Sequence, residues 1–191
     1  MAPRVGILGF QGCIEPHEEI LATFGASTLR VTSPHDLTQI DRLILPGGES
    51  TTMLRFIKRF EMVPALQEFA RHHPVWGICA GAILAARQVH NPSQGSLDLI
   101  DISAHRNFYG GQLDSFTTEL QISCQEAPIR AHFIRAPLLA LLPPTQARPI
   151  PTIESSLSSQ PIFISQGHIW ACSFHIELTG DTTLHQRFIA L

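Results

Sequence analysis

Three separated segments of this chain carry residue types suited to nucleophilic catalysis, and the first is built around Cys79. Gly77-Ile78-Cys79-Ala80-Gly81 has the spacing of a nucleophile elbow, in which a sharp turn between a buried strand and a helix lifts the central side chain out of the sheet. A cysteine in this place sits at a helix start, where backbone N–H groups and the helix dipole favour a thiolate. The alternative is an ordinary strand-to-helix turn that buries a cysteine.

A candidate base for this nucleophile lies near the end of the chain, in the segment Ser173 to Thr179. A free thiol has a pKa of about 8.5, so a nucleophilic cysteine needs a base or a positive field. If the backbone stays extended, His175 and Glu177 point to the same face. The carboxylate can then hold the imidazole in the tautomer that accepts the thiol proton. An exposed His and Glu beyond a strand end are the alternative for this segment alone.

The third segment is the turn Leu45-Pro46-Gly47-Gly48-Glu49-Ser50-Thr51. Adjacent glycines leave the backbone free to turn N–H groups toward an oxyanion, and together with the N–H of Ala80 they form a candidate oxyanion hole. A phosphate-binding loop is the alternative, but the G-x-x-x-x-G-K-[ST] signature is absent. No G-x-G-x-x-G follows the first strand either, which argues against a dinucleotide site.

Short apolar runs precede each of these segments and predict buried strands. Strand and helix patterns alternate through the first half, which indicates an α/β fold with three layers: a mostly parallel sheet with helices on both faces. The second half predicts additional antiparallel strands, because Phe116 to Cys124 alternates between apolar and polar residues. The predicted strands are 4–8, 28–31, 42–45, 75–78, 116–124, 129–134, 161–165 and 169–174, and the predicted helices are 17–24, 51–60, 64–72, a short one after Gly81, and 182–190, with a loop over 143–159.

Composition limits the remaining function classes. With 191 residues, 44% of them hydrophobic and 15% charged, the chain is expected to form a single domain over residues 1–191. A net charge of -3 leaves no basic footprint for nucleic acid. The four cysteines form no C-x-x-C pair, so no metal site is expected, and Cys124 and Cys172 are predicted to be buried. No apolar run reaches the length of a membrane helix, and the start of the chain lacks a signal-peptide pattern, so a cytoplasmic protein is expected.

Taken together, the order and spacing of the three motifs resemble the class I (triad) glutamine amidotransferase family. Further segments resemble, within that family, the glutaminase subunits of pyridoxal 5′-phosphate synthase. These segments are Leu8-Gly9-Phe10-Gln11-Gly12, Pro46 to Thr52, Arg106-Asn107-Phe108-Tyr109-Gly110, Phe133-Ile134-Arg135-Ala136-Pro137 and Phe174 to Thr179. The resemblance spans nearly the whole chain.

The resemblance implies a role for each matching position. Cys79, His175 and Glu177 match the family's nucleophile, base and orienting acid. Its glutamine-binding positions are matched by Gly47, Gly48, Glu49, Arg106, Ile134 and Arg135. It further implies hydrolysis of L-glutamine through a cysteinyl thioester, with ammonia passed to a partner synthase subunit in a hetero-oligomer, and no cofactor or metal in the chain itself. The Gly-Gly turn suggests that the oxyanion hole forms only when the partner docks.

Three rival functions stay open at this point. The same chemistry could serve another ammonia-dependent synthase, for an amino acid or a nucleotide. A redox sensor on the same fold could use Cys79 as an oxidisable thiol without needing Glu177. A scaffold that has lost catalysis is disfavoured, because all three triad residues are present.

Overall fold

A central sheet organises the part of the chain that the structure describes. The computed structural model describes residues 3–108, 115–122, 127–144, 146–149, 152–153 and 161–191. Within them, seven strands pair in the order β10-β12-β13-β4-β3-β1-β2. Their bounds are β1 Arg4–Leu8, β2 Ser27–Val31, β3 Arg42–Leu45, β4 Val75–Ile78, β10 Arg148–Pro149, β12 Phe163–Gln166 and β13 Ile169–Cys172.

The middle of this sheet is parallel, as the sequence predicted. β13, β4, β3, β1 and β2 run in one direction, while β12 and β10 join the β13 edge antiparallel. Parallel neighbours end at the same edge of a sheet, so the loops after β1, β3, β4 and β13 lie side by side. Each chemistry-bearing segment follows one of these strands. Sheet order therefore gathers residues that are far apart in the sequence.

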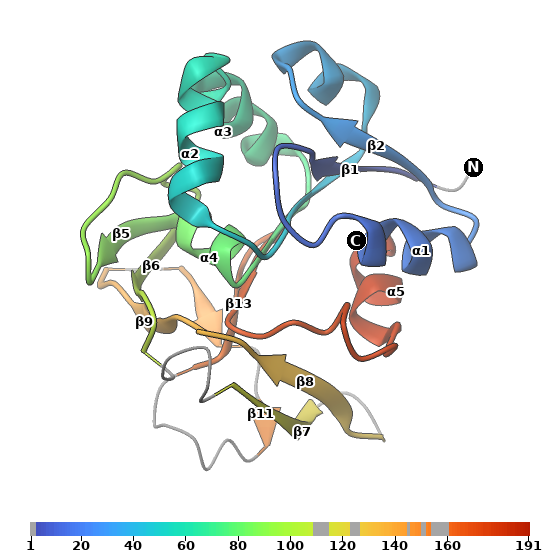
Figure 1. Cartoon of the computed structure of the whole chain (residues 1–191), viewed down its shortest axis with the longest axis vertical. Helices are drawn as coiled ribbons and strands as arrows, with labels where there is room; N and C mark the ends of the chain where they lie inside the picture. The colour runs from blue at the N-terminus through green and yellow to red at the C-terminus, as the bar shows by residue number, and fades with distance from the viewer. Residues whose placement is uncertain (1–2, 109–114, 123–126, 145, 150–151, 154–160) are drawn as a thin grey trace.

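Helices cover both faces and confirm the three-layer prediction (Figure 1). One face carries α1 (Glu15–Thr23) and α5 (Thr183–Ile189), and the other carries α2 (Ser50–Arg59), α3 (Val63–His72) and α4 (Ala80–Ala85). Neighbouring residues of a strand face opposite sides of the sheet, and the core is divided accordingly. Leu43 belongs to the same core cluster as Met53 of α2, whereas Ile44 belongs to the cluster that contains Leu184 of α5. A short 3₁₀ helix, η1 (Pro34–Gln39), connects β2 to β3.

Two small three-stranded sheets complete the second half. One pairs β5 (Ala86–His90), β6 (Ile100–His105) and β9 (Leu138–Leu141), and the other pairs β7 (Phe116–Ile122), β8 (Ile129–Phe133) and β11 (Thr152–Ile153). β7 and β8 confirm the predicted antiparallel strands. The sequence analysis did not predict β5, β6 and β9. The predicted loop over 143–159 contains β10 and β11, and part of it lies outside the described residues, as do Tyr109, Gly110 and Cys124.

The sequence of helix α2 predicts one apolar face made of Met53, Phe56, Ile57 and Phe60, and the structure corrects part of this prediction. Met53 and Ile57 are fully buried, but Phe56 and Phe60 are 36% and 47% exposed. Both rings stack on Phe10, with centroids 5.3 and 5.5 Å away. The exposed phenyl rings therefore cover the loop after β1 rather than the core. In the described part of the chain, no helix combines the length and apolar character needed to cross a membrane.

Candidate active site

Cys79 occupies a strained turn between β4 and α4. Its φ of 49° and ψ of -100° lie in a region that costs a non-glycine residue about 1–3 kcal/mol. The turn is held by the Cys79 N–H, which donates to the Cys172 carbonyl at 2.8 Å. Gly81 permits it, because an added Cβ there would lie 1.8 Å from the Leu45 carbonyl oxygen. The local geometry is that of the nucleophile elbow inferred from the glycine spacing.

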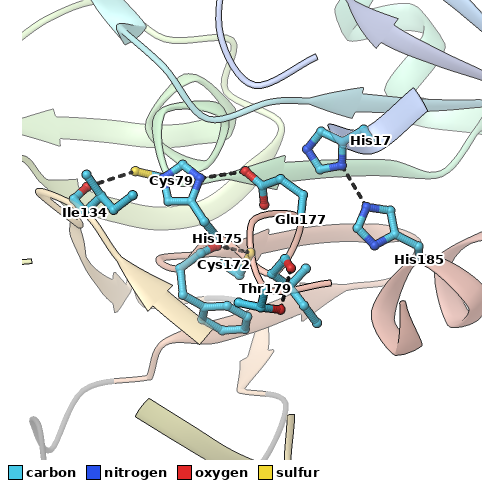
Figure 2. A network of polar contacts seen from close by, with 10 residues as sticks. His17, Cys79, Ile134, Cys172, His175, Glu177, Thr179 and His185 are labelled. Carbon is cyan, nitrogen blue, oxygen red and sulfur yellow. Dashed lines mark hydrogen bonds and ion pairs between the residues drawn. The ribbon is translucent and has the colours of Figure 1, made fainter. Parts of the chain in front are cut away.

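His175 is fixed beside this turn through its backbone and its ring. Its N–H and carbonyl pair with His132 of β8, at 2.7 and 3.0 Å, so the segment after β13 is tied to the sheet that contains β8. The ring Nδ1 lies 2.6 Å from Glu177 Oε1, and both side chains are almost fully buried. Figure 2 shows Cys79 and Glu177 on opposite sides of the imidazole. The structure therefore brings the predicted triad together.

The triad's buried charges stabilise one another. Burial by itself lowers the pKa of His175, but hydrogen bonds with Cys13, Cys79 and Glu177 outweigh burial and raise that pKa above its usual value. For Glu177, burial raises the pKa and the hydrogen bond with His175 lowers it. The net result is a pKa below the usual value for a glutamate. Both shifts favour an imidazolium paired with a carboxylate. A positive charge beside a cysteine sulfur favours the thiolate.

The turn after β3 packs tightly against both the base and the loop after β1. Gly47 faces the His175 ring so closely that an added Cβ would lie 2.1 Å from Cε1. Gly48 has φ +152°, and an added Cβ at Gly12 would lie 2.1 Å from the Gly47 carbonyl oxygen. The Glu49 N–H donates to Gln11 Oε1 at 2.8 Å. Gln11 thus holds the backbone of the glycine turn.

A cavity of about 260 Å³ opens over these groups. Its lining comprises Gln11, Cys13, Gly48, Glu49, Ser50, Cys79, Ala80, Ile83, Arg106, Asn107, Ile134, Arg135 and His175. All predicted site residues line it except Gly47 and Glu177, which lie behind the imidazole. Sequence reasoning did not assign Cys13, Ser50, Ile83 and Asn107, and it left the role of Gln11 undecided.

The far wall of the cavity carries both a positive and a negative side chain, which are the charges needed to bind the two charged groups of an amino acid. The Ile134 carbonyl accepts a hydrogen bond from Cys79 Sγ at 3.8 Å, which places the segment after β8 next to the sulfur. Arg135, at φ +46°, pairs with Glu49 at 2.7 Å, and both side chains are about half exposed. Arg106 adds a second guanidinium to the lining. Cationic and anionic groups at this spacing suit an α-carboxylate and an α-ammonium.

A buried histidine pair lies beyond the triad. His17 Nδ1 and His185 Nε2 are 2.7 Å apart (Figure 2). Both rings contact Trp76 edge to face. Burial lowers the pKa of His17 to about 4 and that of His185 to about 3, so both are neutral near pH 7. Glu177 favours the charged form of each, but burial outweighs it. A separate group, Cys13 with His175 and Glu177, has metal-ligating atoms within 4.8 Å of one another.

Comparison with known proteins places these features in a family context. The model of the SNO glutamine amidotransferase family matches residues 7–191. The chain is 41% identical over 192 residues to the pyridoxal 5′-phosphate synthase subunit PdxT of Herpetosiphon aurantiacus, covering 98% of this chain and 99% of that protein. It is 42% identical over 193 residues to PdxT of Deinococcus radiodurans, covering 98% and 96% of the two chains.

Solved structures agree with this comparison. A crystal structure described as a glutamine amidotransferase superposes with a TM-score of 0.87 at 30% identity, covering 97% of each chain. A chain in the structure of PurLQS from Thermotoga maritima has a TM-score of 0.64 at 16% identity, covering 100% of this chain and 99% of that one. The second similarity shows a shared fold.

Proposed function

The chain belongs to the SNO glutamine amidotransferase family, and on this premise we propose that it is the glutaminase subunit of a pyridoxal 5′-phosphate synthase. It hydrolyses L-glutamine to L-glutamate and ammonia, and the ammonia passes to a partner synthase subunit in a hetero-oligomer. The observation that carries the chemistry is the strained Cys79 beside an imidazole that Glu177 holds at 2.6 Å.

In the proposed mechanism, Cys79 attacks the side-chain amide carbon of glutamine. His175 takes the thiol proton, and the raised pKa of His175 stabilises the resulting imidazolium next to the thiolate. The imidazolium then protonates the amino group of the tetrahedral intermediate, and the C–N bond breaks to release ammonia and leave a γ-glutamyl thioester on the sulfur. Water activated by the neutral imidazole hydrolyses this thioester to glutamate and restores the thiol. Glu177 orients the ring throughout and stays ionised, consistent with its lowered pKa.

Backbone N–H groups of Ala80 and of the Gly47-Gly48 turn hold the oxyanion in this proposal. Each such donor is worth roughly 10²–10³ in rate. Gly48, at φ +152°, is held in a conformation that favours glycine, and Gln11 accepts the neighbouring Glu49 N–H. Docking of the synthase subunit completes the donor geometry by moving this turn. The isolated chain therefore has little glutaminase activity, and full activity of the chain alone contradicts this gating.

The glutamine backbone binds at the opposite wall. Arg106 and Arg135 contact the α-carboxylate, and Glu49 contacts the α-ammonium. The Glu49–Arg135 pair is half exposed, so separating it to admit the zwitterion costs about 0–1 kcal/mol. The Ile134 backbone lies against Cys79 and positions the amide end of the substrate above the sulfur.

Glutamate release tests this function directly. Wild type, Cys79→Ala and Cys172→Ala are each assayed with glutamine, with and without the synthase subunit. Cys172→Ala is the matched control, because this second buried thiol faces the Phe174 carbonyl and burial raises its pKa. We expect Cys79→Ala to abolish glutamate release and Cys172→Ala to retain it per folded molecule. Activity in Cys79→Ala refutes the assignment.

Two further assays distinguish this function from its two rivals. The glutaminase of another ammonia-dependent synthase releases glutamate only with that synthase and not with the one that makes pyridoxal 5′-phosphate. In contrast, a redox sensor keeps its peroxide reactivity in Glu177→Ala, whereas the glutaminase loses turnover in that variant. Loss of glutaminase in Glu177→Ala, with an unchanged fold, supports the hydrolase.

A further inference from the structure

Cys13 brings a second thiol to the catalytic base, and the proposed glutaminase mechanism does not use it. The Cys13 N–H donates to the Gly47 carbonyl at 3.0 Å, which anchors the loop after β1 against the glycine turn. The Cys13 sulfur lies within 4.8 Å of a His175 ring nitrogen, and the side chain lines the cavity, half-buried, so an ion in solvent can reach it. One imidazole therefore has two thiols and a carboxylate around it.

The donor atoms are spaced for a small metal ion. Cys13 Sγ, a His175 ring nitrogen and a Glu177 carboxylate oxygen all lie within 4.8 Å of one another. Zinc binds sulfur at about 2.3 Å and nitrogen or oxygen at about 2.0–2.2 Å, so its tetrahedral ligands lie about 3.3–3.7 Å apart. Closing onto an ion requires Cys13 to approach by at most about 1.5 Å, and the 2.6 Å contact between His175 and Glu177 to open by about 1 Å.

Glu177 supports the same conclusion from the buried side. Glu177 is only 4% exposed, and its Oε2 atom is buried. This atom accepts no hydrogen bond from any other residue in the described ranges. A buried carboxylate oxygen with no such partner is costly, and a cation satisfies it. Thiolate, imidazole and carboxylate together are the donor set of zinc rather than of magnesium or calcium.

We infer that Cys13, His175 and Glu177 form an inhibitory binding site for a thiophilic divalent cation such as Zn²⁺. On binding, Cys13 loses its proton to solvent, and the ion replaces the proton shared by His175 and Glu177. A metal-bound His175 cannot accept the Cys79 proton, so glutamine hydrolysis stops. The fourth position is open to water. The inhibitory part rests on the proposed glutaminase function, whereas the binding part does not.

Cobalt spectroscopy on the purified full-length chain tests binding without any activity assay. A Co²⁺ ion bound to a thiolate shows charge-transfer absorption in the near ultraviolet. We expect this band in wild type and in Cys79→Ala, and its loss in Cys13→Ser. Zn²⁺ should displace Co²⁺. Cys13→Ser should weaken Zn²⁺ binding at least roughly tenfold, because losing even a residue that only supports a metal ligand lowers metal affinity by about that factor. His72→Ala, which removes an exposed His–Glu pair, should bind as wild type does.

The outcomes separate the two proposals. A band that persists in Cys13→Ser, or no band in wild type, overturns the metal site, and circular dichroism establishes that each variant is folded. Glutamate release with the synthase subunit should fall on adding Zn²⁺ and return with a chelator, and Cys13→Ser should resist the same Zn²⁺ concentration. A bound metal in a chain without glutaminase activity refutes the proposed function alone. Active, metal-bound enzyme that Zn²⁺ does not inhibit refutes the inhibitory role.

Discussion

A single methyl group at Gly47 should disable the site through His175. Gly47 is not among the glycines with positive φ, so alanine can adopt its backbone conformation, and the expected effect is purely steric. The new Cβ would lie 2.1 Å from Cε1, 2.8 Å from Nδ1 and 3.1 Å from Nε2 of His175. Non-bonded carbon atoms rest about 3.5–4.0 Å apart, so ring and backbone must separate by more than about 1 Å.

The ring is expected to move rather than the backbone. The Gly47 carbonyl is held by the Cys13 N–H at 3.0 Å, and the Gly12 backbone packs directly against it. A shift of about 1 Å breaks the 2.6 Å contact with Glu177 and costs roughly 10²-fold in turnover. Overpacking should also lower the free energy of unfolding by about 1–3 kcal/mol.

Steady-state glutaminase assays and denaturant melts of Gly47→Ala measure both effects, with Gly95→Ala as the matched control. A Cβ at Gly95 meets nothing closer than 3.4 Å, so this control should retain activity and stability. The decisive arm repeats Gly47→Ala in a His175→Ala background, where the methyl enters the space left by the ring. The destabilisation should largely vanish there, which gives a coupling energy on the order of 1–3 kcal/mol. Additive stability losses, or Gly47→Ala retaining more than about a tenth of wild-type turnover, refute the reasoning.

Two further predictions concern the groups around the triad. The unfolded chain binds more protons than the folded one at pH between about 4 and 6.5, because burial lowers the pKa of His17 to about 4 and that of His185 to about 3; stability should therefore fall by at least roughly 3 kcal/mol as the pH drops through this window. Urea melts should show this slope and a shallower one in His17→Gln, where His185 remains; an unchanged slope contradicts the prediction, since the lowered pKa of Glu177 acts below about 4.5. Gln11→Ala should lower kcat up to about tenfold with little change in KM, because one hydrogen bond to the Glu49 N–H is lost, and Gln11→Glu should restore most of it by keeping an acceptor. Equal losses in both variants, or a change confined to KM, exclude this positioning role.

Local patterns in the sequence were sufficient for the parallel strands of the central sheet and for the nucleophile turn. The apolar runs gave β1, β3 and β4 with the bounds that the structure shows, because fully buried parallel strands are continuously apolar and end in glycine turns. The Gly77 and Gly81 spacing likewise predicted the elbow. At each glycine, backbone atoms of another residue lie so close that a Cβ would clash with them. These features depend on neighbours in sequence, which a pattern can record.

Features that depend on pairing between distant segments could not be read in the same way. β9 looks like an isolated apolar stretch between prolines, and its partner β6 lies far back in the chain. Phe56 and Phe60 fall on the periodic apolar face of α2, yet they stack on Phe10, a contact that no helical period encodes. His17 follows a proline at the start of α1 and gives no signal of its buried partner in α5.

Sheet order explains why the sequence revealed the triad but not Cys13. The order β13-β4-β3-β1 places the loops carrying the base, the nucleophile, the glycine turn and Cys13 in succession along one edge. The first three loops carry paired residue types whose chemistry is recognisable before folding. Cys13 stands alone in its loop, and only the pairing of β1 with β3 brings its backbone to Gly47 and its sulfur to His175. The role inferred for Cys13 therefore depends on which strands are neighbours in the sheet. The triad residues, in contrast, are recognisable from their local sequence motifs.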